Sequence, residues 1–297
     1  MKYRISHVTR YAYSDPVSLC HSIAHLKPRS MPHQRVINAS LRITPWPSVT
    51  REHQDFFGNR VSYFSLQQSH SMLEISAASE VEVDHQPVPG PDADPPWEAS
   101  LQQLQDSRDP EHLAARSFTL PSPAIDSQPD ALAFAQPSFA PGRPLLEATT
   151  DLMHRIYQDF EYDPSFTTVA TPLSEVLAHR RGVCQDFAHL GIAALRGLGL
   201  AARYVSGYLE TLPPPDKPKL RGADASHAWF AVFIPGHGWV DLDPTNNCLL
   251  SEQHITTAIG RDYQDVTPVR GVFYGGGEHE LSVAVDVDRI LPTEPAS

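Results

Sequence analysis

The sequence predicts an α+β protein in which a β-rich N-terminal module precedes a domain built from helices and an antiparallel sheet. Three observations support this fold class. Residues 1–85 alternate apolar and polar side chains as strands do, residues 86–143 are rich in proline, and residues 144–297 begin with helical patterns and continue with strand patterns. We therefore expect three parts with these boundaries: the module, a linker or connection, and a domain that ends in a C-terminal strand segment.

The N-terminal module shows the two-residue period of half-buried strands. Side chains suited to the inner face recur at alternate positions: Tyr3, Ile5, Thr9, Tyr11 and Tyr13, then Leu73, Ile75 and Ala77. The run Pro45–Pro47 interrupts any regular element, because proline lacks the amide donor. Asp55–Val61 predicts a turn that enters a strand, with Gly58 and Asn59 both supplying positive φ angles.

Proline dominates the connection. Gln86–Pro96 is unsuited to a helix or an inner strand, since proline fixes φ and cannot donate a hydrogen bond. In residues 97–143 further prolines separate short segments. We expect these residues to run over the surface as connections with a few helical turns.

Three helical patterns open the last part. Leu145–Tyr157 gathers apolar side chains on one face, and Thr171–Leu177 predicts a second, short helix, with Phe160–Asp163 as a loop between them. The third pattern begins at Cys184 and is closed by Gly199; its apolar stripe consists of Phe187, Leu190, Ala194, Leu195 and Leu198. Cys184 is therefore expected at the N-terminus of a buried helix.

Strand patterns follow this helix. Ala201–Glu210 predicts one strand, and His227–Ile234 with Trp239–Asp243 predicts a hairpin around the turn Pro235–Gly238. A histidine on one strand of a hairpin can face an acid on the other. Asp241 and Asp243 share one face because they lie two residues apart, so without the register the residues leave the choice between them open.

Composition limits the classes of function. The net charge of -12 and the isoelectric point near 5.6 argue against nucleic acid and anionic membranes as partners. No apolar run approaches the roughly 20 residues that span a bilayer, and Met1–His7 has no apolar block behind its two cations. We expect a cytoplasmic protein.

The cysteines and histidines predict neither a disulfide framework nor a metal site. Cys20, Cys184 and Cys248 are the three cysteines of the chain; they form no CxxC pair and have no zinc-site spacing. The 15 histidines are scattered. We expect no metal and no cofactor, with Cys20 and Cys248 as small buried hydrophobic residues.

Cys184 has a setting suited to nucleophilic chemistry. The partial positive charge and free N–H groups of a helix N-terminus favour a thiolate and can bind an oxyanion. On the helix position alone, a small residue chosen for packing explains Cys184 equally well. A lone histidine that opens a strand is more often structural, but the acid near His227 and the upstream cysteine favour a catalytic role.

These segments resemble the transglutaminase-like branch of the papain-type thiol enzymes. Gly182–Cys184, His227–Trp229 and Trp239–Thr245 match that family's three motifs in order and spacing. The resemblance implies Cys184 as nucleophile, His227 as base and Asp243 as orienting acid, with Trp229 and Trp239 either lining the site or belonging to the core.

The flanking segments extend this resemblance. Asp55–Val61 resembles the N-terminal region that accompanies this domain in bacterial proteins, and Gly260–Gly271 resembles their C-terminal segment. No acidic cluster resembles the calcium sites of the animal cross-linking enzymes, so calcium activation is not carried over.

The implied function is that of a cysteine-dependent amide-bond hydrolase or acyl transferase. It would act on peptide- or protein-like carboxamides through a thioester, with hydrolysis favoured because water needs no second binding site. Two other classes stay open: a peptide-binding or assembly protein with a vestigial thiol site, and a metal-dependent hydrolase. The segment Thr211–Asp224 is expected to border the cleft.

Overall fold

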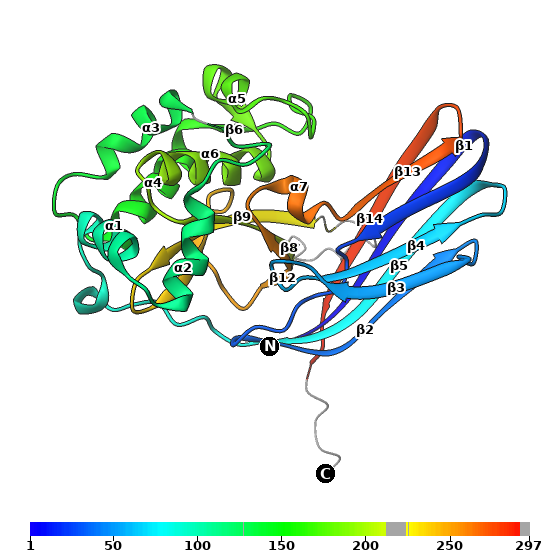
Figure 1. Ribbon diagram of the computed structural model, residues 1–297, viewed down its shortest axis with the longest axis horizontal. Coiled ribbons are helices and arrows are strands. Elements are labelled where there is room, and N and C mark those ends of the chain that lie inside the picture. The colour runs from blue at the N-terminus through cyan, green and yellow to red at the C-terminus, as the bar shows by residue number, and fades with distance from the viewer. Residues whose placement is uncertain (127, 212–223, 225, 292–297) are drawn as a thin grey trace, which may run out of the picture.

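The computed structural model describes residues 1–126, 128–211, 224 and 226–291, and it combines helices with antiparallel sheets as predicted. Figure 1 shows two bodies, a long-stranded sheet and a helix-covered core. Most of the segment Thr211–Asp224 lies outside the described residues. None of the helices in the described parts of the chain is both long and apolar enough to span a bilayer.

The first sheet has seven strands, and two of them come from the C-terminal end of the chain. Its strands are β1 (Lys2–Ala24), β2 (Gln34–Thr44), β3 (Val49–Gln54), β4 (Arg60–Leu66), β5 (His70–Val83), β13 (Val269–Gly275) and β14 (His279–Arg289). The domain boundaries expected from the sequence group β13 and β14 with the last part, but both strands pair antiparallel with β1. Strand patterns carry no information about the pairing partner, so this grouping was not accessible from the sequence.

Strand β1 organises the sheet because it pairs with other strands over most of its length. Its first half lies between β5 and β14, and its second half lies between β4 and β13. The pairing is interrupted around Ser14–Pro16, and Figure 1 shows the strands turning back at their outer ends. Alternate side chains of β1, beginning with Tyr3 and Ile5, are buried, which is the predicted two-residue period.

The connecting segment is more helical than the sequence predicts. It contains α1 (Trp97–Asp106), α2 (Pro110–Arg116) and α3 (Pro129–Ala135). Pro110 and Pro129 occupy first-turn positions, where the missing amide donor costs nothing, so they begin helices instead of breaking them. Leu104, Phe118 and Phe134 are buried, so the segment covers the core as well as connecting its neighbours.

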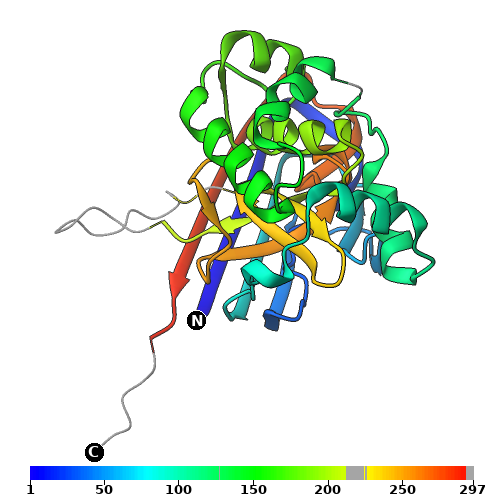
Figure 2. The same ribbon diagram turned by 90° about the vertical axis from the view of Figure 1, so that its left-hand side faces the viewer.

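The core consists of helices against one face of an antiparallel sheet (Figure 2). The helices are α4 (Leu145–Asp159), α5 (Leu173–His179), α6 (Cys184–Gly197) and α7 (Tyr263–Val266). The strands, in spatial order, are β11 (Cys248–Leu249), β10 (Gly238–Asp243), β9 (Ser226–Ile234), β8 (Ala202–Leu209) and β12 (His254–Gly260). Helix α6 packs closely on β9: a Cβ on Gly191 would lie 2.6 Å from the ring of Phe230.

The predicted loop Phe160–Asp163 contains a short strand. Residues Glu161–Tyr162 form β6, which pairs in parallel with β7 (Arg181–Gly182). The amide of Asp163 also donates to the carbonyl oxygen of Gly182 at 2.9 Å. This pairing fixes the backbone that leads directly into Cys184.

Side-chain amides of the module bind the outer edge of the core sheet. The side chain of Asn59 donates to the carbonyl oxygen of Ile259 at 2.7 Å and accepts from its amide at 2.9 Å. Gln34 makes the same pair of bonds with the backbone of Thr256, both at 2.8 Å. The expectation of positive φ at both Gly58 and Asn59 is right only for Gly58, with φ of 76°. The buried side chain of Asn59 instead makes the pair of hydrogen bonds with β12 that the backbone of a neighbouring strand would make.

We predict that Asn59→Ala lowers the free energy of unfolding by about 2–4 kcal/mol, because two buried backbone groups of Ile259 lose their partners. Urea denaturation followed by circular dichroism measures the change. Asn38→Ala, at an exposed position of β2, is the matched control and should leave the free energy within about 0.5 kcal/mol. Equal losses in the two variants would contradict the proposed role of Asn59.

Candidate active site

Cys184 is the first residue of helix α6, as the sequence predicts, and its backbone is held by Asp186. One carboxylate oxygen of Asp186 accepts from the amide of Val183 at 2.9 Å and from the hydroxyl of Thr167 at 2.8 Å. A Cβ at position 182 would lie 2.9 Å from this carboxylate, so Gly182 leaves the space that Asp186 needs. Burial raises the pKa of Asp186, while the two hydrogen bonds oppose that rise.

The β9–β10 hairpin places His227 beside one of the two acids. His227 lies near the start of β9, and its Nε2 is 2.7 Å from Oδ2 of Asp243 at the end of β10. Asp241 faces other partners: its oxygens accept from the indole of Trp229 at 3.0 Å and from the side chain of Gln86 at 3.2 Å. The structure therefore brings His227 together with Asp243.

The imidazole of His227 lies between a carboxylate and a thiol. Burial by itself would lower its pKa, but the hydrogen bonds to Asp243 and Cys184, together with the charges of these groups, raise the pKa well above the ordinary value. Because Nε2 bonds to Asp243, Nδ1 is the nitrogen that remains for the thiol. His227 is thus held as an imidazolium at neutral pH, next to a half-buried Cys184.

Asp243 is fully buried and accepts hydrogen bonds from every side. Oδ2 accepts from His227 at 2.7 Å, His254 at 3.1 Å and the side chain of Asn246 at 2.6 Å. Oδ1 accepts from the backbone amides of Thr245 at 2.9 Å and Asn246 at 3.2 Å. Burial would raise the pKa of Asp243, but the bonds from the two histidines and Asn246 lower it far below its usual range, so the carboxylate stays ionised.

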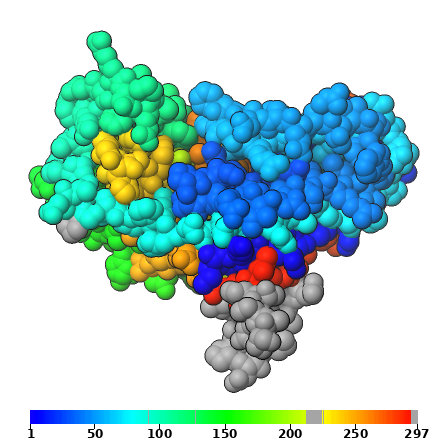
Figure 3. Space-filling view, turned by 90° about the horizontal axis from the view of Figure 1, so that it is seen from below, coloured from blue at the N-terminus to red at the C-terminus, as the bar shows by residue number. Residues whose placement is uncertain are grey.

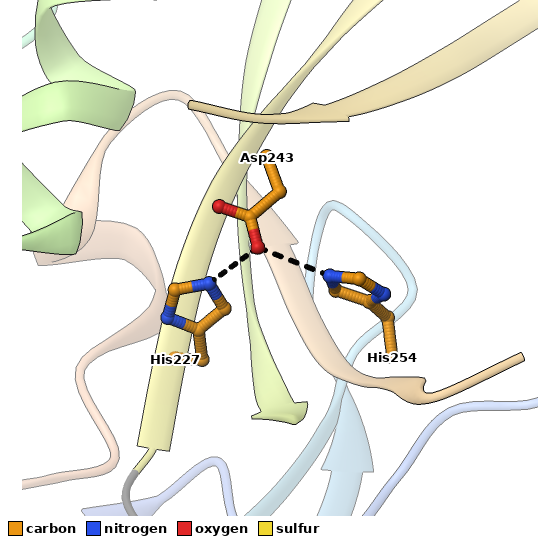
Figure 4. A group of neighbouring side chains, drawn as sticks. All are labelled: His227, Asp243 and His254. Atoms are coloured by element: carbon orange, nitrogen blue, oxygen red, sulfur yellow. Dashed lines mark hydrogen bonds and ion pairs between the residues drawn. The ribbon is translucent and has the colours of Figure 1, made fainter. Parts of the chain in front are cut away.

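His254 is a member of this group that the sequence did not suggest. It opens β12 and is buried, and Figure 4 shows its ring and that of His227 directed at the same oxygen of Asp243. Its Nδ1 accepts from the backbone amide of Ser251 at 3.3 Å, so Nε2 carries the hydrogen that is donated to Asp243. The sequence feature that could have indicated His254 is its place, like that of His227, at the start of an apolar strand.

The two tryptophans occupy different surroundings. Trp229 has no exposed surface, and its ring lies 5.3 Å from that of His254 and 6.0 Å from that of His227. Trp229 therefore belongs to the core, where its ring packs beside both histidines and has no exposed surface that could contact a substrate. Trp239 packs against Phe118 at 5.1 Å and beneath the guanidinium of Arg203 at 4.3 Å, beside a separate cavity.

Among the described residues, His227, Asp243 and His254 form a group whose side chains could hold a metal ion. Their ligand atoms lie within 4.8 Å of one another. Three further N–H groups, from Thr245 and Asn246, also donate to the carboxylate of Asp243. A metal ion bound to Oδ2 would have to displace the hydrogen bonds from His227, His254 and the side chain of Asn246.

Cys20 and Cys248 do not share the environment of Cys184. Cys20 is buried, and burial raises its pKa. Burial, followed by the charge of Asp243, raises the pKa of Cys248 to about 11, so its thiol stays protonated at neutral pH.

A cysteine at the start of a buried helix, with a histidine and an aspartate on adjacent strands of an antiparallel sheet, defines the papain-type class of thiol-enzyme folds. Two family models match the chain: the bacterial transglutaminase-like N-terminal region over residues 3–82, and the transglutaminase-like superfamily over residues 133–244. The chain belongs to the transglutaminase-like superfamily.

Relatives cover nearly the whole chain. An uncharacterised protein of Mycobacterium tuberculosis (strain H37Rv) is 43% identical in an alignment of 295 positions, which covers 96% of this chain and 92% of the relative. One of Mycobacterium leprae is 31% identical in an alignment of 292 positions, which covers 97% of this chain and 98% of the relative. Among solved structures, a candidate cysteine protease from Cytophaga hutchinsonii has a TM-score of 0.77 at 23% identity, covering 99% of this chain and 92% of that one. This last likeness shows the shared fold.

We predict that His254→Phe slows thiol alkylation of Cys184 by about tenfold or more, the effect typical of losing a side chain that orients a functional group. The pH profile of alkylation should change as well, because Asp243 loses one of its donors. Alkylation by iodoacetamide, followed by mass spectrometry from pH 5 to 9, measures both. His53→Phe, on the exposed face of β3, is the control and should behave like the unmodified protein.

The His227–Asp243 pair predicts a pH-dependent contribution to stability. The pKa of His227 is raised on folding, so its contribution is complete below about pH 6.5 and is lost as the pH rises toward the folded-state pKa. The pKa of Asp243 is lowered, so its contribution is complete above about pH 4.

The loss of unfolding free energy in His227→Gln should therefore be larger at pH 5 than at pH 9, as measured by denaturant titration. A loss that grows with pH would contradict the proposed charge state of the pair.

Proposed function

We propose that this protein is a cysteine-dependent amide-bond hydrolase or acyl transferase that acts on peptide- or protein-like carboxamides. The observation that carries the proposal is the position of His227, which contacts Asp243 at 2.7 Å and lies beside the thiol at the start of helix α6. A thiol with an imidazole partner, which is oriented in turn by a third group, is the arrangement of activated nucleophiles in acyl transfer. Membership of the transglutaminase-like superfamily supports the same reaction class.

Each residue has a role in the proposed reaction. The thiolate of Cys184 attacks the carbonyl carbon, and the carbonyl oxygen becomes an oxyanion next to the free N–H groups of the first turn of α6. His227 gives its proton to the leaving amine as the C–N bond breaks, which leaves a thioester on Cys184. Water or an amine then attacks the thioester, with His227 as the base, and regenerates the thiol.

Asp243 and its surroundings keep His227 ready for both proton transfers. The carboxylate holds Nε2–H, so that Nδ1 faces the thiol, and it stabilises the imidazolium that is present before the first transfer and forms again in the second. His254 and Asn246 act through Asp243 by fixing the position of the oxygen that His227 contacts. They are positioning residues.

Hydrolysis is the preferred outcome, because water needs no second binding site. The likeness in fold to a candidate cysteine protease from Cytophaga hutchinsonii supports a peptide-like substrate. We further propose that the protein acts in the cytoplasm, without nucleic acid or a membrane as partner, in accord with its net charge of -12.

We predict that Cys184 reacts with iodoacetamide well below pH 8 in the folded protein, whereas Cys20 and Cys248 do not. Reaction at Cys184 should fall sharply in His227→Ala, since the imidazolium that favours the thiolate is removed. Peptide mapping by mass spectrometry assigns each adduct to a cysteine. A Cys184 thiol that reacts only after unfolding would leave the binding or assembly protein with a vestigial thiol site as the better description.

A glutamine-containing peptide library, incubated with and without a primary amine, separates hydrolysis from transfer. Hydrolysis gives shortened or deamidated peptides in both samples, whereas transfer gives amine adducts in the second. Cys184→Ala should abolish either product. Activity that survives this substitution but is lost with a chelator would support the metal-dependent hydrolase instead.

A further inference from the structure

A second cavity lies where the N-terminal module meets the β9–β10 hairpin. Figure 3 shows the blue module against the yellow hairpin on this face of the molecule. The cavity has a volume of about 420 Å³, within the range of small-molecule sites. Its lining includes Arg29, His33, Gln86, Arg203, His237 and Trp239. Cys184, His227 and Asp243 are not part of that lining, so the cavity is separate from the proposed thiol site.

Arg203 is the unusual feature of this cavity. Its side chain lies on β8 and the residue is only 6% exposed, yet its Nε is buried without a hydrogen-bond partner. Within the described residues, its guanidinium makes no hydrogen bond and has no carboxylate oxygen within 4.0 Å. One face of the guanidinium rests on the ring of Trp239 at 4.3 Å. A buried cation with free donors is costly unless another group satisfies it.

A second guanidinium faces the same cavity. One Nη atom of Arg29 donates to the carbonyl oxygen of Phe57 at 3.0 Å and to the side chain of Asn59 at 2.6 Å. Its Nε, like that of Arg203, is buried without a partner. The fork of an arginine matches the two oxygens of a carboxylate, so Arg203, whose Nη groups have no hydrogen bond among the described residues, and a second guanidinium on the same cavity favour an anionic, planar ligand.

The charges of the residues around the cavity are compatible with a bound anion. Burial lowers the pKa of Arg203 to about 10, so the group stays charged at neutral pH. Asp241 is the buried anion that interacts with Arg203, but its oxygens already accept from Trp229 and Gln86. Glu111 also lines the cavity, from the exposed first turn of α2, and opposes an anion there.

We propose that the cavity bounded by Arg29 and Arg203 is a second binding site, which takes a small ligand through its carboxylate. The ligand's carboxylate accepts hydrogen bonds from the Nη groups of Arg203, and its remainder lies against Trp239 and the edge of the module. Asp241 offsets part of the charge of Arg203, but its oxygens accept from Trp229 and Gln86, so the ligand's carboxylate would supply the direct hydrogen bonds that Arg203 lacks. The proposal does not depend on the reaction proposed for Cys184.

The first test compares succinate with succinamide, its neutral analogue of similar shape. Isothermal titration calorimetry and thermal unfolding are performed on the full chain at constant ionic strength. Succinate should bind and raise the unfolding temperature, whereas succinamide should do neither. Equal effects of the two compounds, or no effect of succinate, would overturn the proposal.

Two substitutions with opposite expected effects locate the site. Arg203→Met should weaken succinate binding by at least about tenfold, since the main donor and charge are lost. Glu111→Gln removes an opposing charge from an exposed position and should strengthen binding by about threefold at low salt. Because Glu111 is exposed, this variant tests the proposal even if Arg203→Met does not fold; unchanged affinity in Glu111→Gln would overturn it.

Cys184→Ala separates the two sites. This variant should bind succinate with unchanged affinity, because Cys184 does not line the cavity. Loss of succinate binding in Cys184→Ala would place the anion at the thiol site and overturn the proposal of a second site.

Discussion

The buried carboxylate of Asp243 is the constraint on which the arrangement of the core depends. A charged group with no exposed surface is tolerated only when its oxygens are fully hydrogen-bonded. Its donors come from β9, from the turn after β10 and from β12, so these elements have to meet at one point. The antiparallel order of the core sheet brings them there, and the charge of His227 follows from the same carboxylate.

The N-terminal module contributes to this site through β12. His254 begins that strand, and the backbone of Thr256 and Ile259 further along it is bound by Gln34 and Asn59 of the module. An edge strand exposes unpaired backbone groups, and here side-chain amides satisfy several of them. The module thus holds the strand that presents His254 to Asp243. Strands β13 and β14 pair with β1 in the seven-stranded sheet of the module, so both ends of the described chain contribute to that sheet.

Local patterns in the sequence predicted the elements that carry the candidate site, but not every contact between them. The helical stripe behind Cys184 and the alternation around His227 depend on near neighbours, so the bounds of α6 and of the hairpin followed from them. The family motifs favoured Asp243, whereas the residues alone left Asp241 open until the register was known. His254 and the pairing of β13 with β1 depend on contacts between distant segments, which no local period records.

The two acids of β10 show how one face of a strand can serve two electrostatic environments. The side chains of Asp241 and Asp243 point to the same side of β10, but they have different partners. The indole N–H of Trp229 donates to Asp241, whereas its ring packs against the two histidines that bind Asp243. Asp243 accepts from the imidazole of His227, whose pKa is raised, and from four further side-chain and backbone groups. Asp241 receives only neutral donors, although the nearby Arg203 carries a charge. Among the described residues Arg203 has the charge of Asp241 nearby but no direct hydrogen bond to a carboxylate, and this distinguishes the Arg203 cavity from the closed network around Asp243.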